Sequence, residues 1–180
     1  MKRIGIFGGS FNPVHVGHLS LARQLLRLAR LDEVWLMVSP QNPLKRSADL
    51  LDDEKRREMV RLAVANEAGL VACDYEMNLP KPSYTWHTLQ SLQQDFPDCR
   101  FVLLIGGDNW ALFSHWYHAE DILEHYDVVV YPRRGSNIDT RSLPPSVTVV
   151  NAELLDLSST DVRRRIACGE SIEGMVPPEI

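Results

Sequence analysis

The sequence predicts an α/β protein: a doubly wound parallel β-sheet flanked by helices, in a single domain over residues 1–180. Short apolar segments rich in β-branched residues alternate with segments whose apolar residues recur every three or four positions. Such alternation is typical of βαβ units, whose right-handed crossovers give a parallel sheet with helices on both faces. The chain has no internal repeat, low-complexity tract or linker, which favours one domain.

The first elements follow from apolar runs and the residues that end them. Residues 3–7 form an apolar run that two glycines end, and residues 15–30 carry leucines and alanines at helical spacing. Residues 33–39 are rich in strand formers and stop at Pro40. The following segment, 40–51, contains two prolines and is predicted to be a loop.

The middle of the chain repeats this order. A helix is expected over residues 52–66, because an aspartate can cap its start and Met59, Leu62 and Ala63 fall on one inward face. It is followed by a strand at 70–74, a loop with two prolines at 75–83 and a helix at 84–95.

The last part of the chain contains its most apolar run, FVLLI at residues 101–105, which predicts a central strand buried on both faces. Helical segments at about 108–125, a strand at 127–131, a loop at 132–146, a strand at 147–150 and a helix from about Ser159 to Gly169 follow. Ligands of a doubly wound sheet bind at the carboxyl ends of its strands, near the switch in strand order. The segments at those ends read GGSFNP, SPQNPLK, GGDNW and YPRRG.

Composition excludes several classes of protein. A net charge of −5 argues against a broad surface for a nucleic-acid polymer. The sequence has no apolar run long enough to span a membrane. The three cysteines are far apart and form no CxxC pair, which favours free thiols in a reducing cytoplasm over a disulfide framework or a zinc site.

Residues 8–18, GGSFNPVHVGH, join a glycine turn to the start of a helix. Gly8 and Gly9 permit sharp turning and close approach of a ligand, and the free amides of the helix are expected to face the same space. His15 and His18 are spaced to share a helical face, and Gly17 between them is expected to leave room for something large. Together these features indicate a polyphosphate site, although an ordinary turn, exposed histidines and a two-histidine metal site are alternatives.

Residues 157–163, LSSTDVR, form a second candidate anion site. Ser158, Ser159 and Thr160 are good N-cap residues, so an ordinary helix start is one interpretation. Arg163 lies one turn into that helix, where its guanidinium can return and fork onto phosphate oxygens.

The two segments resemble the signatures of the nucleotidyltransferase superfamily, whose members share a Rossmann-like fold. Residues 8–18 resemble (G/T)xFxPxHxGH, with Asn12 where many relatives have Asp, and residues 157–163 resemble ISSTxxR. Within the superfamily, the double glycine, the middle segment and GGDNW resemble the nicotinate-nucleotide adenylyltransferases. The chain ends at VPPEI, where similar enzymes usually continue into a short helix, so the sequence leaves open whether the C-terminus is truncated.

The resemblance implies transfer of the adenylyl group of ATP to nicotinate mononucleotide, with release of pyrophosphate, in NAD biosynthesis. It implies that Lys45 closes over the phosphates, although an exposed loop lysine is the alternative. Asp108 is expected to hold ribose hydroxyls, with helix capping as its alternative, and Arg133 or Arg134 to touch the nucleotide. The expected catalytic residues are His15, His18, Lys45 and Arg163, and the expected ATP-binding residues are Gly8, Gly9, Ser10, Phe11, Gly106, Asp108, Ser159 and Thr160.

The resemblance also places the nicotinate ring on Thr85, Trp116 and Tyr117. Tryptophans near a cleft can stack on a flat ring, and the alternative, which we prefer for Trp110, is that they fill the core. The ring carboxylate is expected to meet backbone amides and the Thr85 hydroxyl, which favours an acid over a carboxamide.

No general base is expected, because a phosphomonoester is largely dianionic at neutral pH. Catalysis is expected from positioning and from neutralising charge on the phosphates, with Mg²⁺ bound mainly through the phosphates of ATP. The alternatives are sister enzymes that adenylate nicotinamide mononucleotide or phosphopantetheine or cytidylate a small phosphate, and a non-catalytic nucleotide sensor. The sequence leaves the oligomeric state open, including a homodimer.

Overall fold

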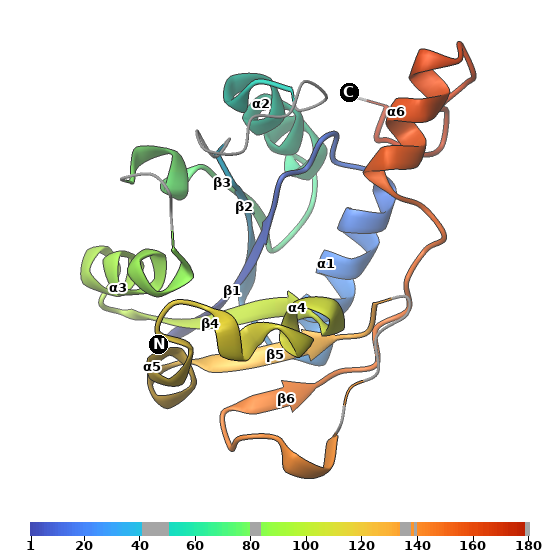
Figure 1. Ribbon diagram of the computed structural model, residues 1–180. Coiled ribbons are helices and arrows are strands. Elements are labelled where there is room, and N and C mark those ends of the chain that lie inside the picture. The colour runs from blue at the N-terminus through green and yellow to red at the C-terminus, as the bar shows by residue number, and fades with distance from the viewer. Residues whose placement is uncertain (41–50, 80–83, 134–137, 139, 179–180) are drawn as a thin grey trace.

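The computed structural model describes residues 1–40, 51–79, 84–133, 138 and 140–178, and it contains one six-stranded sheet (Figure 1). All of its strand pairs are parallel, in the order β3-β2-β1-β4-β5-β6, which confirms the doubly wound prediction. The strands are β1 (Lys2–Gly9), β2 (Glu33–Val38), β3 (Leu70–Cys73), β4 (Cys99–Gly106), β5 (Asp127–Tyr131) and β6 (Val147–Val149).

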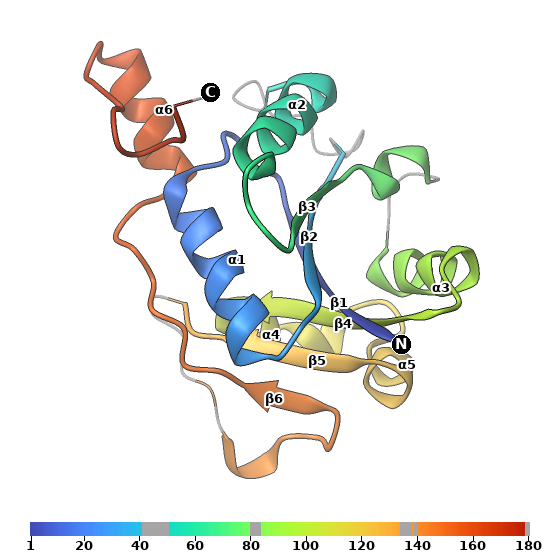
Figure 2. The same ribbon diagram turned by 180° about the vertical axis from the view of Figure 1, so that it is seen from behind.

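Helices cover both faces of this sheet (Figures 1 and 2). Buried side chains of α1 (Val16–Leu28) and α2 (Asp53–Val64) form one core cluster with one face of the sheet. Side chains of α3 (Thr85–Asp95), α4 (Gly107–Ala111) and α5 (Ala119–His125) pack on the other face. Single 3₁₀ turns at Tyr75–Asn78 and Thr140–Ser142 interrupt two segments predicted as loops, and a third is found at Phe113–His115.

The central strand β4 is buried on both faces, as its sequence predicts. Val102 and Leu104 belong to the core cluster under α1 and α2, whereas Phe101, Leu103 and Ile105 belong to the opposite cluster. Side chains alternate between the faces of a strand, so an apolar residue at every position indicates a covered face on each side.

The inward face of α2 differs from the prediction. Val60, Ala63 and Val64 are buried, while Leu62 is half-buried. The buried stripe also includes Arg56, a charged residue that hydrophobic periodicity alone assigns to the solvent side. Its burial is compensated by hydrogen bonds from all three guanidinium nitrogens, as described below.

The strand order switches between β1 and β4, and the carboxyl ends of these strands define where a ligand is expected. The last helix, α6 (Ser159–Ala167), lies beside the N-terminal end of α1 in both views (Figures 1 and 2). Far-apart parts of the sequence therefore meet at this edge of the sheet. Among the described residues, no helix is both long and apolar enough to cross a membrane.

Candidate active site

A cavity of about 760 Å³ opens at the switch point and is lined by both sequence motifs. This volume lies within the range of pockets that hold small ligands. Its lining includes most of the residues predicted to bind ATP or act in catalysis: Gly8, Gly9, Ser10, Phe11, His15, His18, Asp108, Ser159, Thr160 and Arg163. Lys45 and Arg134 lie outside the described residues.

The wall from β1 is extended, so the prediction of a turn at the two glycines is wrong. Gly8 and Gly9 pair with Met37 and Val38 of β2 and continue the strand. A Cβ added to Gly8 would meet nothing within 4 Å, which leaves this part of the backbone open to the cavity. The chain turns later, at Phe11, whose φ of 47° lies in the left-handed region that side chains disfavour.

The two histidines cap α1 reciprocally. His15 is the N-cap residue, with an extended backbone, and its Nδ1 accepts a hydrogen bond from the Gly17 amide at 3.1 Å. Nδ1 of His18 accepts one from the His15 amide at 3.1 Å, and the rings stack with centroids 3.7 Å apart. A neutral imidazole that accepts at Nδ1 carries its proton on Nε2. The backbone therefore assigns the tautomer of both rings and leaves each Nε2–H as a donor.

Both imidazoles are neutral in the free protein at pH 7. Burial, followed by the charge of Arg133, lowers the pKa of His15 to about 4. Burial, followed by the charges of His15 and Arg133, lowers the pKa of His18 to about 3. In the free protein these rings thus offer hydrogen-bond donors rather than positive charge.

The N-terminus of α1 is not the open anion site that the sequence predicts. The Val16 amide donates to the Met175 carbonyl at 2.9 Å, and the Gly17 amide to His15 Nδ1. The His18 amide donates to the His15 carbonyl at 3.1 Å. The first three amides of the helix are satisfied, so the donors that this end of α1 offers to the cavity are the imidazole Nε2–H groups.

Gly17 has a different use from the predicted one. A Cβ at this position would lie 2.8 Å from Cε1 and 2.9 Å from Nδ1 of His15. Real Cβ atoms essentially never approach another atom so closely. Glycine is required because the His15 ring folds back over the first turn of α1.

The second motif is bonded directly to the first. Ser159 Oγ donates to the Pro13 carbonyl at 2.8 Å, and Arg163 Nη1 donates to the Asn12 carbonyl at 2.5 Å. Arg163 Nη2 also reaches Thr160 Oγ1, at 3.2 Å. These bonds span about 150 residues of sequence and make the two motifs neighbouring walls of one cavity.

The N-terminus of α6 differs from that of α1 in the hydrogen bonding of its first amides. Ser158 is the N-cap, and its hydroxyl accepts from the Asp161 amide at 3.1 Å. In the part of the chain that the structure describes, the amides of Ser159 and Thr160 have no hydrogen-bond partner. Two free amides at the positive end of a helix, with Arg163 beside them, suit a phosphate.

Gly106, the last residue of β4, lets the side chain of Arg133 pack directly against the backbone. A Cβ at Gly106 would lie 2.5 Å from Arg133 Cγ and 2.7 Å from Asp108 Oδ1. Arg133 Nε lies 3.8 Å from Asp108 Oδ1, and both side chains line the cavity. Asp108 makes no side-chain cap on α4, which removes helix capping as an explanation for this carboxylate.

The residues predicted to bind nicotinate lie outside the cavity lining. Thr85 is the first residue of α3, and Trp116 packs on Phe113 with ring centroids 4.9 Å apart. Tyr117 is 47% exposed and packs on Tyr84 with ring centroids 4.8 Å apart. The structure places Trp116 and Tyr117 between the short helices that follow β4, and their role stays a prediction.

Sequence reasoning missed several residues of this site. Tyr131, the last residue of β5, lines the cavity, and burial raises its pKa to about 12, so its hydroxyl stays protonated. Its position at the carboxyl end of a strand was the available signal. Leu154, Leu155 and Asp156 also line the cavity, and nothing in their sequence indicates this.

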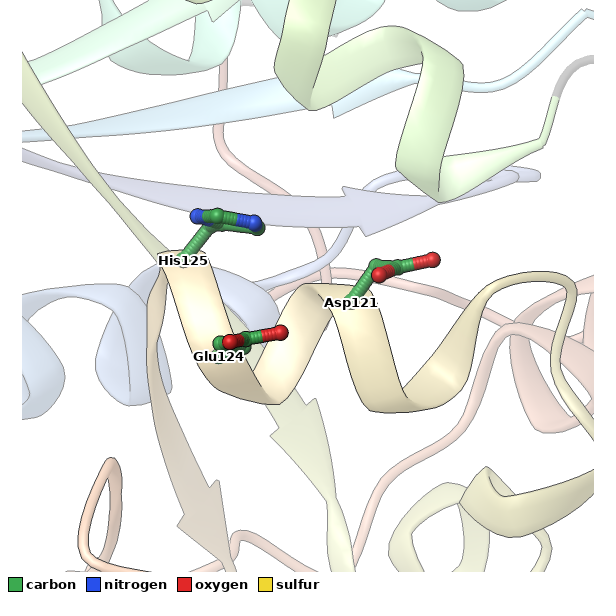
Figure 3. A group of neighbouring side chains, drawn as sticks. All are labelled: Asp121, Glu124 and His125. Carbon is green, nitrogen blue, oxygen red and sulfur yellow. The ribbon is translucent and has the colours of Figure 1, made fainter.

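A group of side chains that could hold a metal ion lies elsewhere, on α5 (Figure 3). Ligand atoms of Asp121, Glu124 and His125 lie within 4.8 Å of one another. Asp121 is also bonded to Nδ1 of His118 at 2.6 Å. None of these residues belongs to the cavity lining, so the group does not contribute to the candidate active site.

The chain is similar to proteins of a known family. The cytidylyltransferase-like family matches residues 6–165. A Bacteroides fragilis protein named "probable nicotinate-nucleotide adenylyltransferase" is 44% identical over 99% of this chain and 89% of its own. A Cytophaga hutchinsonii protein of the same name is 43% identical over 99% of this chain and 93% of its own.

A solved structure has the same fold. Plasmodium falciparum nicotinic acid mononucleotide adenylyltransferase, complexed with NaAD, has a TM-score of 0.80 and 20% sequence identity over 99% of this chain and 92% of its own. The chain belongs to the cytidylyltransferase-like family and, within it, to the nicotinate-nucleotide adenylyltransferases.

Proposed function

We propose that the protein transfers the adenylyl group of ATP to nicotinate mononucleotide, giving nicotinate adenine dinucleotide and pyrophosphate in NAD biosynthesis. The observation that carries this proposal is the junction of the two motifs, where Arg163 and Ser159 bond to the carbonyls of Asn12 and Pro13. Two donor sets thereby face one cavity: the imidazoles on one wall and the start of α6 on the other. The names of the relatives support the same substrates.

The chemistry needs no general base from the protein. The phosphate of the mononucleotide has a second pKa near 6, so one of its oxygens is an anionic nucleophile at neutral pH. That oxygen attacks the α-phosphorus, the bond to the bridging oxygen breaks, and pyrophosphate leaves with the electron pair. The protein's task is to align the two phosphates and to stabilise charge on them.

The two imidazoles act on the α-phosphate in this scheme. His15 and His18 present Nε2–H donors whose orientation is fixed by the bonds at Nδ1 and by their mutual stacking. Phe11 packs edge-on against His18, with ring centroids 4.9 Å apart, and restricts it further. Donors that are already aligned stabilise a transition state without reorganisation.

The start of α6 receives the departing pyrophosphate. The free amides of Ser159 and Thr160 and the guanidinium of Arg163 bind the β- and γ-phosphates. We propose that Lys45 adds a further positive charge and that Asp108 and Gly106 meet the adenosine.

Mg²⁺ fits this site as a partner of ATP. The cavity lining offers carboxylate oxygens on Asp156 and Asp161, and oxygen ligands are those that Mg²⁺ prefers. When bound, the ion neutralises phosphate charge. We propose that Asp156 and Asp161 would help to hold the ion, which would bind mainly through the phosphates of ATP.

The mononucleotide is proposed to bind at the start of α3 and the segment after α4, through Thr85, Trp116 and Tyr117. Backbone amides and the Thr85 hydroxyl can donate to a ring carboxylate, whereas a carboxamide presents an NH₂ donor to them. The acid is therefore the preferred substrate.

The three free cysteines and the use of ATP support the cytoplasm as the location of the protein.

Release of pyrophosphate in the presence of ATP and Mg²⁺ tests this function. Nicotinate mononucleotide, nicotinamide mononucleotide and phosphopantetheine are compared as acceptors at equal concentration. We expect the highest kcat/KM with nicotinate mononucleotide. A higher value with either other acceptor would assign the chain to a sister activity, and ATP binding without turnover on any acceptor would indicate a nucleotide sensor.

A further inference from the structure

A fully buried arginine joins three chain segments, one of which lines the cavity. Arg56, on α2, has no exposed surface. Its Nε donates to the Leu51 carbonyl at 2.9 Å, and Nη1 donates to the carbonyls of Ser10 and Ser39 at 2.8 and 2.7 Å. Nη2 donates to Asp53 Oδ1 at 2.5 Å. The planar fork of the guanidinium suits several fixed acceptors at once.

Each of the three carbonyls belongs to a segment that shapes the site. Ser10 lines the cavity itself. Ser39 follows β2, and its amide donates to the Gly9 carbonyl at 2.9 Å. The Leu51 amide donates to Asn12 Oδ1 at 3.0 Å. Arg56 therefore fixes the loop after β1 both directly and through its two neighbours.

That loop carries groups which contact the proposed catalytic residues. Phe11 packs against the ring of His18, and Asn12 gives its carbonyl to Arg163. The loop is thus held by one guanidinium from α2 and by another from α6. A small shift of the loop would move both the imidazole donor and the arginine.

Hydrogen bonds from Ser39 also lead toward the proposed mononucleotide site. The half-buried carboxylate of Glu76 accepts hydrogen bonds from the hydroxyls of Ser39 and Thr88, the latter at 2.9 Å. Thr88 lies one turn after Thr85 on α3. Through Glu76, Ser39 therefore connects the loop after β1 to α3. This helix begins at Thr85, which is predicted to bind nicotinate.

Stability alone gives a weak reason for this arrangement. Burying a charged group costs several kcal/mol of desolvation, and an apolar side chain of similar volume is often at least as stable. What an apolar residue lacks is the set of directional bonds to Ser10, Ser39 and Leu51. Directional bonds fix positions, which is what alignment of two phosphates requires.

We propose that Arg56 is a positioning residue for adenylyl transfer, acting through the carbonyls of Ser10, Ser39 and Leu51 to hold the loop after β1 in its reactive position. This inference rests on the proposed function. Arg56 acts on the reaction without contact to either substrate.

The test is the variant Arg56→Lys, which keeps the positive charge but lacks the planar guanidinium that donates to several carbonyls at once. Pyrophosphate release gives kcat, and calorimetric titration gives the Kd of ATP, both well below the midpoint of thermal unfolding. Because misplacement of about 1 Å can cost on the order of 100-fold in rate, we expect kcat to fall about tenfold or more, while the Kd changes less than about threefold. Arg61→Lys is the matched control, since Arg61 lies exposed on the same helix and pairs with Glu58.

Two results would overturn the proposal: a kcat for Arg56→Lys within about twofold of Arg61→Lys, or a kcat loss that matches an equal loss of ATP affinity. If Arg56→Lys does not fold, Asp53→Asn replaces it, because it weakens one bond to the guanidinium at the protein surface. A kcat loss of about threefold or more is then expected, and an unchanged kcat contradicts the proposal. If the wild-type protein has no activity on nicotinate mononucleotide, the result contradicts the proposed function itself.

Discussion

At the scale of single residues, the site depends on two imidazoles whose Nδ1 atoms are occupied by backbone amides. Asparagine can imitate this arrangement, because its Oδ1 can accept the same bond while it lacks a group equivalent to Nε2–H. Substitutions to asparagine therefore separate the capping role of each histidine from its proposed role toward phosphate.

His18→Asn is expected to lower kcat by about 100-fold or more, the loss typical of removing one transition-state donor. The Kd of ATP should change far less, because binding is shared with α6. Steady-state kinetics and calorimetric titration measure the two quantities, and His115→Ala, at an exposed position, is the control. An unchanged kcat in the asparagine variant would exclude His18 from catalysis.

The lowered pKa values also predict how stability depends on pH. In the unfolded chain these histidines have a pKa near 6.5, whereas in the folded protein the pKa is about 4 for His15 and about 3 for His18. As the pH falls below 6.5, the unfolded chain binds protons that the folded chain does not, so the free energy of unfolding decreases.

Between pH 7 and pH 5, each histidine should account for a loss of about 1–2 kcal/mol. Urea unfolding of the wild type and of His18→Asn at the two pH values measures this, because the variant lacks one contribution. Equal pH dependence in both proteins would mean that His18 does not titrate as described.

At the scale of elements, the two helices that meet at the cavity differ in what their N-termini offer. The amides of α1 are satisfied by His15 and by the Met175 carbonyl, whereas the amides of Ser159 and Thr160 in α6 have no partner among the described residues. The sequence predicts both helix starts correctly but not this difference, because capping by a histidine side chain leaves no familiar pattern.

Gly17→Ala tests the packing at the start of α1. Alanine is favoured in a helix by about 1 kcal/mol over glycine, but here its Cβ would clash with the His15 ring. We expect kcat to fall by about tenfold or more, as for other small displacements of catalytic groups, without a gain in stability. Ser20→Ala, on the same helix, serves as the control. A variant that is both more stable and fully active would show that the ring adjusts freely.

At the scale of the whole molecule, the sheet brings together segments about 150 residues apart. Alternating apolar periods predict the strand and helix order, and the polar segments after the strands predict the edge where the cavity forms. The burial of Arg56 could not be predicted, because it depends on carbonyls from other segments of the fold. The need for glycine at position 17 could not be predicted either, because it depends on how the His15 ring folds over the first turn of α1. Hydrophobic periodicity describes one helix face at a time and contains no such contacts.

The separation of Trp116 from the cavity lining predicts separate effects on the two substrates. Trp116→Ala should raise the KM for nicotinate mononucleotide by about tenfold, the loss of one aromatic stacking contact, and leave the KM for ATP nearly unchanged. Initial rates with each substrate varied in turn measure both constants. The opposite pattern would place the nicotinate ring elsewhere.

A crystal structure with a non-hydrolysable ATP analogue and nicotinate mononucleotide tests the central claim most directly. The predicted result is an α-phosphate oxygen about 3 Å from His18 Nε2, within hydrogen-bond range, with the outer phosphates on the amides of Ser159 and Thr160. A triphosphate bound away from both walls of the cavity would contradict the claim.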